Sequence, residues 1–129
     1  MKIFRRHDSP LKPADTKSFV GRADTGLLAS SEDPGAAVHV YRVQFGRNGR
    51  TNWHAHSGPQ WLFIVDGRVR VQKWGEAPIE LETGDAVVIA AGEKHWHGAA
   101  PESTGTHLAV NINVKTEWME AVTDADYRN

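Results

Sequence analysis

Two groups of histidines are the residues of this chain best suited to chemistry. The chain has seven histidines and no cysteine, so imidazole, carboxylate and amide groups are its available metal ligands. His54 and His56 are separated by one residue, and residues i and i+2 of a β-strand point to the same side. Both imidazoles can therefore reach one ion at about 2.1 Å. A single His-x-His pair is also common on protein surfaces, so whether it binds a metal depends on the residues around it.

The second group is His95-Trp96-His97, and Gln60 stands between the two groups in the sequence. His97 shares a face with His95 if the strand there is regular. In that position, His97 either contacts a substrate or is packed and hydrogen-bonded. Gln60 also has two interpretations, because its amide oxygen either binds an ion directly or hydrogen-bonds a water molecule on it.

The segments that must position these groups have the pattern of short β-strands. From about residue 17 to residue 114, β-rich runs alternate with Gly and Asp turn residues, which favours an all-β sandwich or barrel. Asp66-Gly67 lies between two such runs and predicts a tight hairpin turn, because glycine adopts positive φ at low cost. The apolar residues 86–90 predict a strand that is buried on both faces.

The end of the chain predicts one more strand and one helix. Residues 106–114 alternate, with Leu108 and Val110 on one face and His107 and Asn111 on the other. Residues 117–122 predict a short helix that closes the barrel.

Composition limits the classes of partner. The 129 residues suit one domain, which we place at 17–129, preceded by an arm or edge strand at 1–16. With 15 basic and 16 acidic residues, the net charge is −1, so neither nucleic acid nor a membrane surface is an expected partner. The charged N-terminus has no apolar core of a signal peptide, and a cytoplasmic protein is expected.

Both histidine groups resemble the paired signature of the cupin family. The first motif of that family corresponds to five residues spread over positions 49–67: Gly49, His54, His56, Gln60 and Gly67. The second corresponds to Gly84, Ala90, Gly92, His95 and Ala99. The sequence departs from the family pattern at three residues: Gln60 stands in place of a glutamate, Ala90 in place of a proline and Ala99 in place of an asparagine. In addition, Gly49 is one residue closer to His54 than in the family pattern.

This resemblance implies a cupin fold, a double-stranded β-helix or jelly-roll barrel, with a short C-terminal helix. It also implies one divalent metal held by His54, His56, Gln60 and His95. Three neutral imidazoles and a neutral amide would leave the site with a charge of about +2, which strengthens Lewis acidity and disfavours higher oxidation states of iron.

Residues 92–101, 106–109 and 118–127 resemble a narrower group, the bacterial cupin hydroxynitrile lyases and the carboxymuconolactone decarboxylase-like cupins. The resemblance implies manganese as the metal and His107 as the general base, although such ligands also suit iron, nickel and zinc. The implied reaction cleaves a cyanohydrin to an aldehyde and hydrogen cyanide, with Lys94 or His97 stabilising the departing cyanide.

The same resemblance implies a pocket for a small-molecule substrate and an oligomer. Expected pocket residues are Tyr41 and Asn111, and a homodimer or homotetramer is expected. Trp53 and Trp96 flank ligands, so they either form a wall of the pocket or belong to the core, as tryptophans more often do. Two other functions remain open at this stage. One is a different metal-dependent enzyme, such as a dioxygenase or an isomerase of small organic acids. The other is a cupin that binds a small ligand without catalysis.

Overall fold

The computed structural model describes residues 1–129 and consists almost entirely of strands. None of its helices has the length and apolarity that crossing a membrane requires. The elements in chain order are the 3-10 helix η1 (Arg6–Asp8), β1 (Lys12–Pro13), β2 (Phe19–Val20), β3 (Ala23–Ser31), β4 (Val38–Phe45), β5 (Arg50–Thr51), β6 (His54–His56), β7 (Gln60–Lys73), β8 (Ile79–Glu82), β9 (Ala86–Ile89), β10 (His95–Ala99), β11 (Gly105–Ile112), β12 (Thr116–Trp118) and α1 (Asp124–Arg128).

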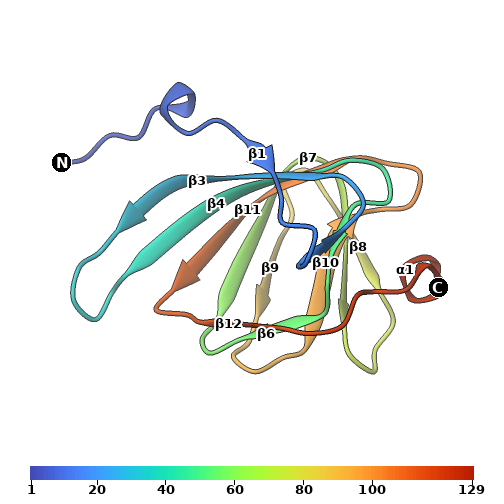
Figure 1. Ribbon diagram of the computed structural model, residues 1–129. Helices are drawn as coiled ribbons and strands as arrows, with labels where there is room; N and C mark the ends of the chain where they lie inside the picture. The colour runs from blue at the N-terminus through green and yellow to red at the C-terminus, as the bar shows by residue number, and fades with distance from the viewer.

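The strands form an antiparallel barrel of two curved halves, as Figure 1 shows. One half contains β1, β3, β4, β11, the first part of β7, and β9. The other contains β2, β5, β10, the second part of β7, and β8, with β6 and β12 attached beside β10. The predicted all-β barrel is therefore confirmed, and the N-terminal residues extend away from it (Figure 1).

The hairpin predicted at Asp66-Gly67 is wrong, because both residues lie inside the continuous strand β7. Gly67 has φ of +68°, and a Cβ there would stand 2.2 Å from the carbonyl oxygen of Thr104. The glycine thus serves a close approach between strands rather than a turn. At this point β7 leaves β9 and β11 and continues along β8 and β10.

Two strands differ from the sequence pattern in how they are buried. β9 lies where residues 86–90 predict a strand, but it is not buried on both faces, since Val88 is 48% exposed. β11 has the two predicted faces, with His107 and Ala109 buried inside the barrel and Leu108 on the outer, less buried face. The polar face of this strand is therefore the inner one, which is the reverse of an ordinary surface strand.

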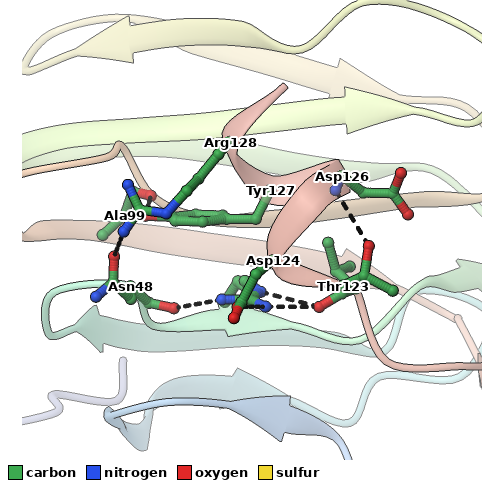
Figure 2. A network of polar contacts seen from close by, with 9 residues as sticks. Asn48, Ala99, Thr123, Asp124, Asp126, Tyr127 and Arg128 are labelled. Carbon is green, nitrogen blue, oxygen red and sulfur yellow. Dashed lines mark hydrogen bonds and ion pairs between the residues drawn. The ribbon is translucent and has the colours of Figure 1, made fainter.

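The C-terminal helix exists but begins later than predicted. Residues 116–118 form β12, which pairs with β6. Helix propensity is a weak local preference, and the pairing of these residues with β6 outweighs it. The helix is α1, whose N-cap Thr123 accepts a hydrogen bond from the Asp126 backbone N–H (Figure 2). The Tyr127 hydroxyl donates to the Ala99 carbonyl at 2.7 Å and anchors the helix to β10.

Candidate metal centre

Four polar side chains converge inside the barrel from three strands. His54 and His56 come from β6, Gln60 begins β7, and His95 begins β10. His54 and His95 face each other in the β6–β10 ladder, and their ring centroids are 4.2 Å apart. The His56 ring lies 5.0 Å from that of His54. All four residues are buried, so the strand pairing itself gathers the donors.

Each of the three imidazoles is held through its Nδ1 atom. His54 Nδ1 donates to the carbonyl of Asn52 at 2.9 Å, and His95 Nδ1 donates to the carbonyl of Glu93 at 2.8 Å. His56 Nδ1 is 2.9 Å from the hydroxyl of Thr116. Because a carbonyl can only accept, His54 and His95 carry their hydrogen on Nδ1 and keep a lone pair on Nε2.

The atoms that remain fit a divalent metal. His56 Nε2, His95 Nε2 and Gln60 Oε1 are buried and have no hydrogen-bond partner. Unpartnered buried polar atoms are costly unless a ligand satisfies them. A donor set of imidazoles and an amide oxygen suits first-row metals such as manganese, iron, nickel and zinc.

Gln60 is oriented by its neighbour across the sheet. Its Nε2 group donates to Asn111 Oδ1 at 2.9 Å, and the two residues are register partners in the β7–β11 ladder. With the nitrogen bound in this way, Oε1 is the atom left toward the histidines. This geometry fits the interpretation of Gln60 as an oxygen ligand.

A second pair of histidines lies behind the first group. His97 and His107 are both buried, and His97 Nδ1 is 2.9 Å from His107 Nε2. The other nitrogens, His97 Nε2 and His107 Nδ1, have no partner. Nitrogens of His54, His95 and His97 lie within 4.8 Å of one another, so His97 borders the ion position as well.

Burial keeps these histidines neutral. Desolvation, assisted by the nearby His56, lowers the pKa of His95 to about 4, and burial lowers the pKa of His107 to about 3. Burial and then the charge of His95 hold the pKa of His54 well below its ordinary value. Burial and the neighbouring His107 do the same to the pKa of His97. Neutral imidazoles are the form that binds metals, so the centre is ready for an ion at neutral pH.

A cavity of about 260 Å³ opens beside the metal centre. Its lining contains aromatic, aliphatic and uncharged polar residues and no Lys, Arg, Asp or Glu: Phe19, Thr25, Tyr41, Val43, Thr51, His54, His56, Gln60, His97, Ala109, Asn111, Thr116 and Trp118. Such a lining suits a small, uncharged and largely apolar molecule.

The structure separates the expected site residues into two groups. Tyr41, His97 and Asn111 line the cavity beside the metal ligands. His107 does not reach it, because it is fully buried against His97.

His95 is outside the cavity lining as well, and three further expected site residues have their side chains engaged elsewhere. Trp53 and Trp96 belong to a core cluster with Val122 and Tyr127. The Lys94 ammonium pairs with Glu120 and lies 3.5 Å from the centroid of the Trp74 ring. The alternation of strand residues explains this result, since Trp96 follows His95 directly and must face the opposite side.

Several cavity residues were not anticipated from the sequence, and three of them are aromatic or contact a ligand. Thr116 and Trp118 come from β12, in a segment next to the predicted helix, and the Trp118 ring lies 4.7 Å from that of His54. Their i, i+2 spacing is the available signal, and it is too short to identify a strand alone. Phe19 comes from β2, where nothing local marks a pocket residue.

Comparison with known proteins agrees with this architecture. Residues 41–111 match the model of the cupin domain family, and the chain belongs to that family. A curated protein of Granulicella tundricola, named (R)-mandelonitrile lyase, is 41% identical over 119 residues, which cover 90% of this chain and 88% of the relative.

Solved structures show the same fold. A cupin-like protein of Thermotoga maritima superposes with a TM-score of 0.87 and 32% identity, covering 99% of this chain and 96% of that one. A polyketide cyclase of Streptomyces resistomycificus has a TM-score of 0.70 at 18% identity, over 98% of this chain and 90% of its own. This second likeness concerns the fold alone.

Proposed function

We propose that this cupin is a metal-dependent hydroxynitrile lyase that cleaves a cyanohydrin to an aldehyde and hydrogen cyanide. The observation that carries the proposal is the 41% identity, over 90% of the chain, to a relative named (R)-mandelonitrile lyase. The cavity supports it independently. Its aromatic side chains Phe19, Tyr41 and Trp118 suit an aryl group.

His54, His56, Gln60 and His95 would hold the metal, with manganese as our choice. The bound ion would supply positive charge close to the substrate oxygen and so lower the pKa of the hydroxyl group. Because the four ligands are neutral, no ligand charge offsets that of the ion.

The histidine pair would move the proton. His97 lines the cavity, and its Nε2 atom has no hydrogen-bond partner, so we assign it as the residue that accepts the hydroxyl proton. His107 holds the His97 ring in place through the hydrogen bond between them. As the O–H bond breaks, a C=O bond forms. The C–C bond to the nitrile breaks at the same time, and the nitrile carbon keeps the electron pair as cyanide. The proton then returns to the cyanide, which leaves as HCN.

The test is cyanide release from mandelonitrile by protein reconstituted with manganese. Activity that disappears in His54→Ala and persists in His7→Ala supports the proposal, because His7 lies on the exposed arm. Protein that binds manganese yet releases no cyanide from mandelonitrile or aliphatic cyanohydrins would contradict it.

A further inference from the structure

Gln60 differs from His54 and His95 in what orients it, and His56 is held by the Thr116 hydroxyl. Two of the imidazoles are fixed by backbone carbonyls, of Asn52 and Glu93, and those groups do not change with the side chain present. Gln60 is fixed by a side chain, Asn111, through one hydrogen bond of 2.9 Å. An amide has an oxygen and a nitrogen at nearly the same positions, so only its partners decide which one faces the ion.

We infer that Asn111 is a positioning residue that selects the metal-binding orientation of Gln60. Asn111 Oδ1 is an acceptor, so it accepts only from the Gln60 nitrogen and leaves Gln60 Oε1, which is buried and has no partner, toward the ion. With the Gln60 amide turned over, two oxygens would meet unless the Asn111 amide turned with it, and in either case an NH2 group would face a cation. That orientation is unfavourable.

The position of Asn111 in the fold makes this role direct. It stands opposite Gln60 in the β7–β11 ladder, where facing side chains lie within contact distance. It also lines the substrate cavity, so the contact lies at the boundary between the metal and the substrate. Residues that orient metal ligands typically contribute about 10- to 100-fold to metal affinity.

The experiment measures manganese affinity by competition with a fluorescent chelator, together with the metal content of the purified protein. Asn111→Leu keeps the approximate volume and removes the acceptor, and we expect it to weaken manganese binding about 10- to 100-fold. Asn111→Asp keeps an acceptor and should retain affinity. The control Thr25→Val changes another polar residue of the cavity, one without a hydrogen bond to a ligand, and should leave affinity unchanged.

A double-mutant cycle distinguishes positioning from a general effect on the barrel. In a Gln60→Leu background, Asn111→Leu should cost nothing further, because no amide remains to be oriented. Equal losses in both backgrounds, no loss in either, or a failure of Asn111→Asp to retain affinity would each overturn the inference.

The inference rests on the metal centre of the proposed function and not on the reaction. Manganese binding with the expected coupling but without cyanide release would contradict only the lyase. A wild-type protein that binds no divalent metal would overturn the positioning role along with the metal centre.

Discussion

At the scale of single residues, the hydrogen bond between His97 and His107 divides their roles. A neutral imidazole carries one N–H, so one ring donates across the 2.9 Å contact and the other accepts. His97 reaches the cavity and His107 does not. The two residues therefore contribute differently to any proton transfer, although the resemblance to hydroxynitrile lyases alone favours His107 as the base.

We predict that His97→Ala lowers cyanide release about 100-fold or more, because it removes the group that receives the proton. His107→Ala should cost less, about 10- to 100-fold, because His97 remains but is no longer held. Initial rates at saturating mandelonitrile, with manganese content measured for each variant, test both. Activity that survives His97→Ala and is abolished by His107→Ala would mean that the two roles are reversed.

At the scale of elements, the C-terminal segment joins the metal centre to the outside of the barrel. β12 provides Thr116 to His56 and Trp118 to the cavity, and the chain then continues to α1. That helix is held by Tyr127, which is fully buried, and by Arg50, whose guanidinium donates to the Val122 carbonyl. The anchor therefore acts on the ligands through β12.

We predict that Tyr127→Phe lowers the free energy of unfolding by about 1–3 kcal/mol, because it leaves the buried Ala99 carbonyl without its donor. Tyr127→Ala should cost about 3–5 kcal/mol and also speed manganese loss to a chelator. Urea denaturation measures the free energy of unfolding, and Ala125→Ser, at an exposed position of the same helix, is the control. A cost below about 1 kcal/mol for Tyr127→Ala would show that the helix does not anchor β12.

At the scale of the whole molecule, the outer face of the β3–β4–β11–β7–β9 half of the barrel carries many apolar side chains, with Arg42 among them. The register aligns one row across it: Ala29, Val40, Val110, Trp61 and Val88. Trp61 is 41% exposed, and Phe63 beside it is 40% exposed. A continuous apolar row of this kind is typical of an interface. We propose it as the contact of the homodimer or homotetramer that the family resemblance implies.

We predict that the protein is a dimer through this face, and that Trp61→Glu converts it to a monomer because the substitution buries a charge at the centre of the contact. Light scattering coupled to gel filtration measures the mass. Ile79→Glu, which adds the same charge at an exposed position of β8, should leave the dimer intact. A wild-type mass equal to the 14.3 kDa of one chain would contradict the prediction.

The barrel and the cupin family could be predicted from the order of residues, and so could the buried cluster of His54, His56, Gln60 and His95. Strand alternation and the His54/His56 pair depend on short-range geometry, which the order of residues specifies. Gln60 and His95 were added by the resemblance to the cupin motifs. The closing helix was located only approximately, because the pairing of β12 with β6 depends on a partner about 60 residues earlier in the chain.

Features that depend on contacts between distant strands became visible in the folded chain alone. The structure showed that Gly67 serves a close approach to Thr104, that Trp53 and Trp96 face the core, and that His107 stands behind His97. The sequence pattern alone is equally compatible with Gly67 in a hairpin turn, with the two tryptophans in a pocket wall and with His107 as a base that contacts the substrate. The physical reason is that burial, pairing and register are properties of two segments at once, and a local pattern contains only one of them.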